Sequence, residues 1–250
     1  MLYLFSRRAL AQLKPYLGND TLLAFDFDGT LAPLVANPSL ASLPRRSASL
    51  LADLSKKFPV ALVSGRSRAD LRPRSPFPLK AWIGNHGMEG VTGARTGAKN
   101  NVRLVKQWEK TLKLALADHP AVVIENKKYS LTLHYRASRN RARAKKLLNH
   151  LVTELTPAPQ IIEGKCILNL LPQGSWNKGT ALVALLESGG YRQAIFVGDD
   201  VTDEDVFRRH DPRIFSVRIG TSKNSAAQAF LRNQKEMELF LRLLLTRESN

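Results

Sequence analysis

Short apolar runs alternate with segments of helical spacing at both ends of the chain. In the helical segments apolar residues recur every three or four positions, as at Leu50, Leu51 and Leu54, which predicts one buried helix face. Continuous apolar runs that alternate with such helices predict a parallel sheet covered on both faces. Strands are expected at residues 21–27, 59–64, 81–84, 194–197 and 214–219, and helices at residues 45–58, 66–71, 178–188, 203–210 and 236–245.

The middle of the chain follows a different order, in which a helix precedes two strands and the pattern then repeats. This order predicts a small α+β domain with one antiparallel sheet. The expected organisation is a parallel α/β core of residues 1–99 and 174–250, interrupted by a cap of residues 100–173 that would act as a lid. In the cap, helices are expected at residues 102–117 and 140–155, and strands at residues 121–126, 129–136, 160–163 and 165–171.

Composition favours a soluble cytoplasmic protein. No apolar run in the 250 residues reaches the roughly 18 to 20 residues that cross a bilayer, and the apolar run at the N-terminus is too short for a secretory signal. The single cysteine, Cys166, excludes an internal disulfide and lies in an apolar run, so we expect a small buried residue rather than a reactive thiol. We expect a cytoplasmic monomer that contacts no membrane.

The formal net charge of +17 raises the question of a nucleic-acid partner. The excess is concentrated in residues 99–150, which carry thirteen Lys and Arg against three acids. Three explanations stay open: a solvated helix face, a basic wall that attracts a phosphorylated substrate, or a nucleic-acid surface. The sequence lacks the interleaved aromatic and basic residues that bind nucleic acids, so no nucleic-acid partner is expected.

Polar residues follow the predicted strands of the core at the points where the strands end. Asp26 and Asp28 follow the first strand, and Ser64 follows the second. Farther along, Lys178 begins a helix and Asp199 follows a strand. The carboxyl ends of parallel strands share one edge of a sheet, so these side chains are expected to converge. Two carboxylates as close as Asp26 and Asp28 repel each other unless a cation or a proton lies between them.

The residue types of this set are those of phosphoryl transfer. An all-oxygen cluster without histidine or cysteine suits a hard cation such as Mg²⁺ rather than zinc. A carboxylate, a lysine and backbone N–H groups around such a cation position a phosphoryl group and neutralise its charge. An aspartate can itself be the nucleophile and form an aspartyl-phosphate.

Short motifs follow one another in order between about residues 20 and 225. They are Asp-Phe-Asp-Gly-Thr-Leu-Ala-Pro, Ala-Leu-Val-Ser-Gly-Arg, Gly-Asn-His-Gly-Met-Glu, Leu-His-Tyr-Arg, Asn-Lys-Gly and Gly-Asp-Asp-Val-Thr-Asp-Glu-Asp-Val-Phe. In this form and order they resemble the motifs of the trehalose-6-phosphate phosphatases, a family of the haloacid dehalogenase superfamily. The resemblance implies a Rossmann-like haloacid dehalogenase core with an inserted smaller α+β cap that grips the sugar and excludes water.

By position, the resemblance also implies catalytic roles. Asp26 would be the nucleophile, and Asp28 would protonate the leaving sugar oxygen and then activate water. Asp26, the backbone carbonyl of Asp28 and Asp199 would hold Mg²⁺, whereas Asp200 and Asp203 would orient waters or Lys178. Lys178 and Ser64 would bind phosphoryl oxygens. The implied substrate-binding residues are Ser64, Gly65, Arg66, Asn85, His86, Glu125, Arg136, Lys165 and Asn169.

Structural roles are the alternatives for several of these residues. Ser64 could be the N-cap of the helix after it, and His86 could be an ordinary loop residue. Glu125, His134 and Arg136 lie on predicted cap strands, where a cross-strand charge pair competes with contact to a sugar. For Arg66, too, a structural role is the alternative to substrate contact.

The cap departs from the family at Asn169, where the family typically has a glutamate, and at Leu171, where it has a basic residue. Asparagine keeps a donor and an acceptor but loses the charge, and a lost acceptor changes which sugar a site prefers. The expected function is a Mg²⁺-dependent phosphatase that releases trehalose and phosphate from trehalose 6-phosphate. The alternatives are the same chemistry on another sugar phosphate or phosphoglycosyl acid, and a non-catalytic binder of sugar phosphate or nucleic acid.

Overall fold

The chain divides into two compact units. A computed structural model describes residues 1–18, 20–35, 37–91, 98–164 and 166–246. The larger unit comprises Met1–Gly93 and Trp176–Asn250, and the smaller unit comprises Ala94–Ser175. The boundaries expected from the sequence, at residues 99 and 173, fall a few residues inside the smaller unit, because its first helix, α4 (Ala98–Ala115), begins before residue 100.

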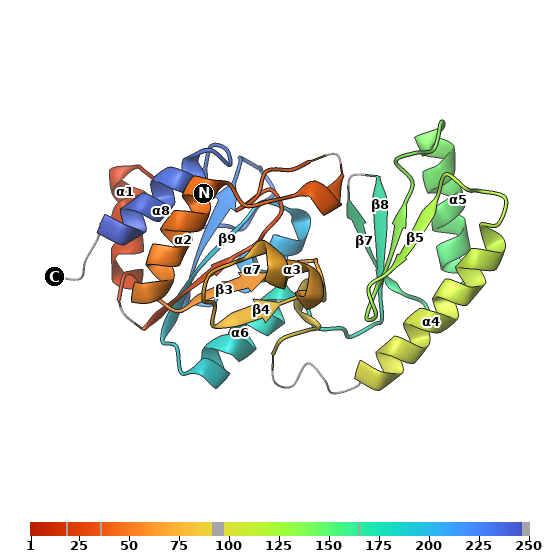
Figure 1. The fold of residues 1–250 in the computed structure, drawn as a ribbon, viewed down its shortest axis with the longest axis horizontal. Helices are drawn as coiled ribbons and strands as arrows, with labels where there is room; N and C mark the ends of the chain where they lie inside the picture. Colours follow the sequence, from red (N-terminus) through yellow and green to blue (C-terminus); the bar gives the residue numbers. More distant parts are fainter. Residues whose placement is uncertain (19, 36, 92–97, 165, 247–250) are drawn as a thin grey trace. The chain divides into compact units, whose positions relative to one another are not determined.

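A parallel sheet forms the centre of the larger unit (Figure 1). Among the described residues it has seven strands, and every neighbouring pair is parallel, which confirms the expected α/β core. From the strand Thr21–Phe25 the chain passes to two strands on one side, and its later strands lie on the other side. In order across the sheet the strands are β1 (Leu2–Tyr3), β11 (Ala229–Leu231), β10 (Ile214–Ile219), β9 (Gln193–Gly198), β2 (Thr21–Phe25), β3 (Val60–Val63) and β4 (Ala81–Ile83).

Both faces of this sheet are buried under helices. Leu23 and Phe25 of β2 belong to one hydrophobic cluster, and the alternate residues Leu22 and Ala24 belong to another. Because β2 must bury both of its faces, its residues form one uninterrupted apolar run. The helices of this unit are α1 (Arg7–Leu13), α2 (Arg45–Lys57), α3 (Arg68–Arg74), α6 (Lys178–Gly189), α7 (Glu204–Phe207) and α8 (Glu236–Thr246). Residues of α2 and α8 join the first cluster, and residues of α6 and α7 join the second.

Some elements of the larger unit differ from the expectation. The sequence pattern did not predict α1, β1 or β11. The two strands have only two and three residues, which is too short for a recognisable periodicity. The helix expected at residues 203–210 is a 3-10 turn, Val201–Asp203, followed by the single turn of α7. The side chain of Asp203 bonds backward to two backbone N–H groups, which fixes this tight turn in place of a longer helix.

The smaller unit is an antiparallel sheet with two helices on one side (Figure 1). Its order confirms the expected repeat of a helix and two strands: α4, β5 (Val123–Asn126), β6 (Leu131–His134), α5 (Arg141–Thr153), β7 (Gln160–Gly164) and β8 (Ile167–Leu171). Leu133 and Leu168 face the helices and contact the cluster that contains Trp108 and Leu148. The alternate strand residues therefore lie on the opposite face of the sheet.

Cys166 differs from the expectation in both its secondary structure and its burial. It occupies the turn between β7 and β8 with a φ of 64°, and its side chain is half-buried rather than buried. The strand expected to begin at residue 165 begins at Ile167. Among the helices of the described residues, none combines the length and the apolar character that a membrane span requires.

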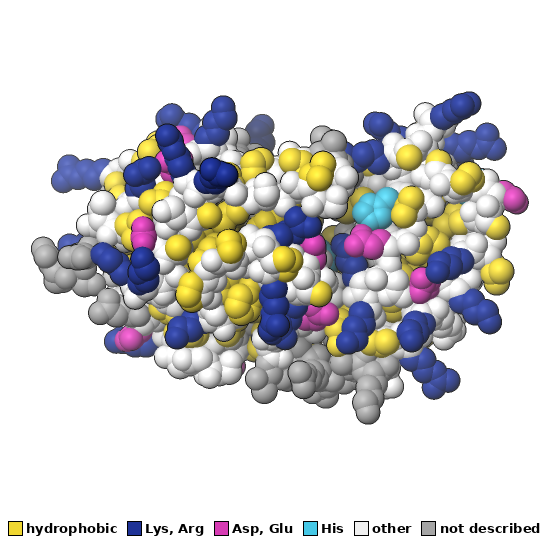
Figure 2. All heavy atoms as spheres, in the orientation of Figure 1, with side chains coloured by type: hydrophobic (Ala, Val, Ile, Leu, Met, Phe, Trp, Pro, Cys, Tyr) yellow, Lys and Arg dark blue, Asp and Glu magenta, His cyan; other side chains and the backbone are white. Residues whose placement is uncertain are grey.

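The basic side chains are spread over the visible face of both units rather than gathered in one stripe (Figure 2). On α5, Arg141, Arg143 and Lys146 are exposed, and Lys145 forms an ion pair of 2.7 Å with Glu163. These positions fit a solvated helix face, which was the first of the three explanations for the charge.

Candidate active site

The carboxyl ends of β2 and β9 meet at the centre of the larger unit. Phe25 of β2 lies opposite Val197 of β9, and the backbone N–H of Asp26 donates to the carbonyl of Val197 at 2.9 Å. The chain leaves β2 toward β3 on one side and reaches β9 on the other, which makes this pair of strands a topological switch point. Open parallel sheets bind ligands at such points. Asp26 and Asp199 follow these two strands and are thereby brought together.

Three carboxylates and one lysine form a cluster at this edge, in which Asp26, Asp203 and Lys178 are buried and Asp199 is half-buried. One oxygen from each of Asp26, Asp199 and Asp203 lies within 4.8 Å of the other two. The Nζ atom of Lys178 donates to Oδ1 of Asp26 at 2.9 Å and to Oδ1 of Asp203 at 2.7 Å, and only 2% of the lysine side chain is exposed. One ammonium neutralises one of three negative charges, so the cluster has the donor set and the excess charge to hold a cation.

The electrostatics of the cluster show the same excess of negative charge. Burial raises the pKa of Asp26 well above its usual range, and Asp203 and Asp199 raise it further against the attraction of Lys178. Burial and the neighbouring Asp203 raise the pKa of Asp199 to about 7. Burial alone would lower the pKa of Lys178, but Asp203 and Asp26 raise it, so the lysine keeps its charge. Asp26 and Asp199 therefore bind protons more readily than ordinary aspartates, and a metal ion bound between them would replace those protons.

The loop after β2 is shaped to fit closely over Asp199. Gly29 has a φ of 80°, and a Cβ atom there would lie 2.1 Å from Oδ2 of Asp199, so only glycine fits. Thr30 is fully buried and donates its hydroxyl to Oδ1 of Asp199 at 3.2 Å. Thr30 was not among the predicted site residues, although its place directly after Asp28-Gly29 is a signal that could have identified it.

A second loop, after β3, holds Ser64. Its hydroxyl accepts from the backbone N–H of Arg66 at 3.3 Å, while Ser67 is the N-cap of α3. The alternative role of Ser64 as the helix N-cap is therefore wrong, because α3 begins at Arg68, two residues later than expected. The turn Asn85–Gly87 supports this loop: the N–H of His86 donates to the Ser64 carbonyl at 3.0 Å, and the N–H of Asn85 donates to the Arg66 carbonyl at 2.7 Å.

Gly65 allows that support. A Cβ atom at this position would lie 2.5 Å from Cε1 of His86, so the imidazole packs directly against the backbone of the loop. Asn85 and His86 are both buried. The predicted candidates Ser64, Gly65, Asn85 and His86 thus form one packed pair of loops beside the sheet.

Asp28 does not join the carboxylate cluster with its side chain. Its two carboxylate oxygens accept bonds from Nε and Nη2 of Arg66, the second at 2.7 Å. The predicted metal ligand at this position was the backbone carbonyl of Asp28, which stays a prediction. Asp203 enters the cluster although it was not predicted as a ligand, because its sequence position gives no sign that its side chain turns back toward β9.

Candidates in the smaller unit gather on the sheet face opposite the helices. Glu125, Thr132 and Asn169 lie side by side on β5, β6 and β8. Asn169 is 6% exposed, and its Oδ1 accepts the hydroxyl of Thr132 at 2.7 Å. Oε2 of Glu125 lies 2.9 Å from Nε2 of His134, which is the cross-strand pair that the sequence offered as an alternative to sugar contact. Arg136 follows β6 and is exposed. The remaining candidate, Lys165, lies outside the described residues.

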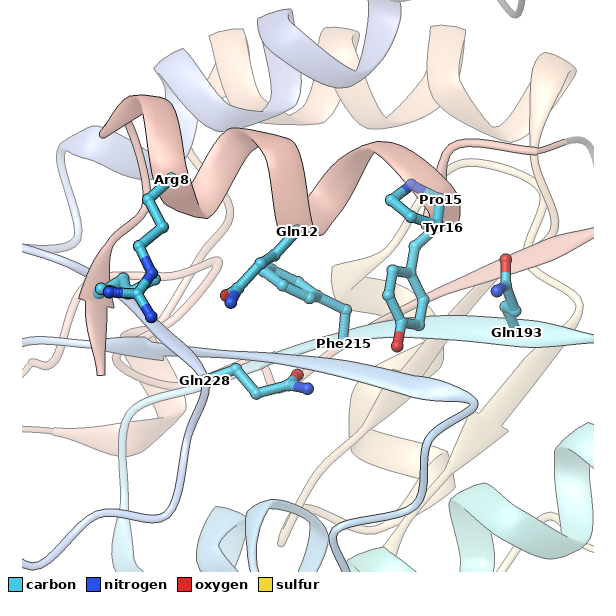
Figure 3. Close-up of a pocket in the computed structure, with 8 residues that line it drawn as sticks. Arg8, Gln12, Pro15, Tyr16, Gln193, Phe215 and Gln228 are labelled. Atoms are coloured by element: carbon cyan, nitrogen blue, oxygen red, sulfur yellow. The ribbon is translucent and has the colours of Figure 1, made fainter.

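A separate groove lies at the opposite end of the core strands (Figure 3). Gln12 of α1 lies over Phe215 and Gln228, and Tyr16 lies beside Gln193, at the start of β9. The groove has a volume of about 610 Å³, and the described residues that line it include no carboxylate. The carboxylate cluster after β2 and β9 is therefore the candidate for chemistry.

Comparison with known proteins gives consistent matches. The family model described as Trehalose-phosphatase matches residues 24–237. Probable trehalose-phosphate phosphatase D of Arabidopsis thaliana is 28% identical over 91% of this chain and 68% of its own length. The trehalose-phosphate phosphatase of Mycobacterium tuberculosis is 33% identical over 73% of this chain and 49% of its own length. The chain thus spans about two thirds of the plant relative and about half of the mycobacterial one.

A solved structure shares the fold. The C-terminal domain of trehalose-6-phosphate phosphatase from C. albicans superposes with a TM-score of 0.71 at 24% identity, over 96% of this chain and 97% of the domain. The likeness shows a common architecture of a parallel sheet and an added antiparallel sheet.

Proposed function

The chain belongs to the trehalose-phosphatase family, and on that basis we propose that it is a Mg²⁺-dependent phosphatase that converts trehalose 6-phosphate into trehalose and phosphate. The observation that supports this most strongly is the buried cluster of Asp26, Asp199, Asp203 and Lys178 at the switch point of the parallel sheet. This is the donor set that phosphoryl transfer requires.

The proposed reaction has two steps. Oδ2 of Asp26 attacks the phosphorus while Lys178 holds Oδ1, the bond from phosphorus to the sugar oxygen breaks, and Asp28 gives that oxygen its proton. A water then attacks the aspartyl-phosphate and gives a proton to Asp28, which releases phosphate and restores Asp26. Ser64 and Lys178 bind phosphoryl oxygens. The all-oxygen donor set of Asp26, Asp199 and Asp203 fits a hard cation such as Mg²⁺. In this proposal Asp26, Asp199 and the backbone carbonyl of Asp28 would hold the ion, which would neutralise phosphoryl charge.

Asp203 has a different task in this proposal. Its Oδ1 accepts from Lys178, and its Oδ2 accepts the backbone N–H groups of Asp199 and Asp200 at 2.8 and 2.9 Å. With both oxygens engaged, Asp203 fixes the lysine and the loop after β9 rather than providing the main bond to the metal.

The metal-free protein is expected to lose stability as the pH rises from about 4 to about 7. The pKa of Asp199 is about 7 in the folded protein against an ordinary 3.8, so over this range the folded state binds a proton that the unfolded state has lost. Saturating Mg²⁺ replaces that proton and should reverse the trend. Urea unfolding across this pH range, with Mg²⁺ and with a chelator, measures both effects. The Asp199→Asn variant is the control: an unchanged slope in it would contradict the assignment.

The sugar is the second part of the proposal. We expect kcat/KM for trehalose 6-phosphate to exceed that for glucose 6-phosphate and other sugar phosphates at least about tenfold, since a site that hydrogen-bonds one sugar leaves polar groups unpaired with another. Phosphate release from a panel of sugar phosphates measures this ranking. The alternative, another sugar phosphate or phosphoglycosyl acid, is favoured by Asn169, whose amide is already bonded to Thr132 and Ile162. A different compound far ahead of trehalose 6-phosphate would establish the alternative.

We further propose that Gly65, Asn85 and His86 contact the substrate from the core, and that Glu125, Arg136, Lys165 and Asn169 do so from the cap. Support comes from the packed loops around Ser64 and from the shared sheet face of Glu125 and Asn169. A cytoplasmic monomer without a nucleic-acid or membrane partner is also proposed, on the basis of the single cysteine and the dispersed charge. Size-exclusion chromatography with light scattering tests the monomer.

A further inference from the structure

Most hydrogen-bond donors of the Arg66 side chain are bonded to other groups of the protein. Its side chain is 10% exposed, and its guanidinium carbon lies 5.5 Å from the centre of the Phe27 ring. Nε and Nη2 bind the two oxygens of Asp28, Nη1 binds Asp70, and Nη2 also donates to the carbonyl of Pro38 at 2.7 Å. A guanidinium has five N–H donors, and four are engaged here, so little capacity is left for a sugar.

Asp70, which binds Arg66, is itself held by Arg74. Oδ1 of Asp70 accepts from Nη2 of Arg74 at 2.8 Å and from its Nε at 3.1 Å. Arg74 in turn donates to the carbonyl of Ala41 at 2.6 Å. The order Asp28, Arg66, Asp70, Arg74 thus alternates charge from the loop after β2 through α3. Such paired, hydrogen-bonded ions hold one arrangement rather than several.

The two aspartates of the first motif are therefore held by two different cations. Lys178 holds Asp26 in the carboxylate cluster, and Arg66 holds Asp28 outside it. A bidentate guanidinium binds one edge of a carboxylate and uses one lone pair of each oxygen. The other edge stays available to exchange a proton with a bound molecule.

We propose that Arg66 is a positioning residue that sets the orientation of Asp28 for proton transfer, and that Asp70 and Arg74 fix Arg66 in that task. The proposal rests on the phosphatase function proposed above and changes the role of Arg66 from a substrate contact to a support of the acid and base. A misplaced catalytic group loses rate without losing binding, so the defect should lie in kcat more than in KM.

The test compares two substrates that differ in the leaving group. A sugar oxygen needs a proton as it leaves, whereas the nitrophenolate of 4-nitrophenyl phosphate leaves without one. Arg66→Ala is expected to lower kcat/KM about 100-fold for trehalose 6-phosphate and less than about threefold for 4-nitrophenyl phosphate. Arg72→Ala removes an exposed arginine from the same helix and is the matched control, with no expected change on either substrate.

The comparison of two substrates does not separate positioning from sugar contact, because the loss of either role would lower kcat/KM for the sugar phosphate alone. A double-mutant cycle separates the two roles. If Arg66 acts through Asp28, Arg66→Ala in the Asp28→Asn background should cause less than about a twofold further loss. A further loss of kcat/KM as large as Arg66→Ala causes in the unmodified protein would overturn the proposal. Equal losses of kcat/KM on the two substrates would also overturn it. Asp70→Asn should show a weaker form of the same pattern. If Arg66→Ala fails to fold, Arg66→Gln enters the same cycle, with thermal melting as the folding check.

The two proposals fail in different ways. If the unmodified protein does not hydrolyse trehalose 6-phosphate but hydrolyses another sugar phosphate, the proposed sugar is wrong. The double-mutant cycle is then measured on that other compound. If no phosphate ester is hydrolysed, the proposed function is wrong and the role of Arg66 is wrong with it.

Discussion

Asp26→Asn is expected to lower kcat for phosphate release by about 10⁴-fold or more, the scale seen when a hydrolase loses its nucleophile. The amide cannot form the aspartyl-phosphate, and the remaining groups can only bind the substrate and polarise it. The variant should nevertheless fold, because asparagine has nearly the same shape and one buried negative charge is removed. Lys178 keeps its bond of 2.7 Å to Asp203 in this variant.

Two measurements check this expectation. Phosphate release under saturating substrate gives the rate, and acid quenching of a reaction with radiolabelled phosphate ester shows whether a covalent phosphoprotein forms. Urea unfolding serves as the control for folding and should give a stability at least equal to that of the unmodified protein, since repulsion and burial disfavour the Asp26 carboxylate. Turnover at the normal rate in Asp26→Asn would exclude Asp26 as the nucleophile.

Lys178→Met is expected to abolish the activity and to lower the free energy of unfolding by about 3–5 kcal/mol, because it leaves two buried carboxylates without their shared cation. Asp26 and Asp203 both lie within 2.9 Å of the lysine Nζ, and the Asp203 side chain is fully buried. Adding Asp203→Asn should recover part of the loss by removing one of the two charges. Added Mg²⁺ should stabilise Lys178→Met more than the unmodified protein, since the uncompensated cluster attracts a cation more strongly.

Urea unfolding of the single and double variants measures these differences. Lys56→Met is the matched control: Lys56 forms an ion pair of 2.8 Å with Asp53 but is 74% exposed, so its loss should cost less than about 1 kcal/mol. Equal stability losses for Lys178→Met and Lys56→Met would show that the buried cluster does not depend on its lysine.

The sequence was sufficient for the fold class because its apolar runs are unambiguous. The run Thr21–Phe25 and the strand Ile214–Ile219 lie where the pattern predicted them, and so do both hairpins of the smaller unit. Short edge strands such as Leu2–Tyr3 were missed, because their pairing with Ala229–Leu231 depends on contacts between the two ends of the larger unit.

The candidate site was predictable where chemistry follows a strand and not where it depends on tertiary contacts. Asp26, Lys178 and Asp199 could be named from their positions, but the adjacency of β2 and β9 that joins them is a matter of strand order, which no local pattern contains. Asp203 was expected to orient waters or Lys178, and its bond to Lys178 agrees with that expectation. Its bonds to two backbone N–H groups could not be predicted, because they depend on how the side chain turns back toward β9. The ion pairs that support Asp28 had a weak signal in the sequence. Arg66, Asp70 and Arg74 recur at intervals of four residues, which is the spacing of neighbours on a helix.

The pairing of β2 with β9 also sets the order of events during synthesis. A chain emerging from the ribosome completes the smaller unit, Ala94–Ser175, before Asp199 and Asp203 have been made. Domains fold as units during translation, whereas a contact between distant segments must wait for the second segment. One edge of β2 therefore remains without its neighbour while the inserted unit is already complete. A nascent chain that ends before Asp203 lacks one of the two carboxylates that bind Lys178, so the cluster cannot be complete until β9 and the turn after it have been made.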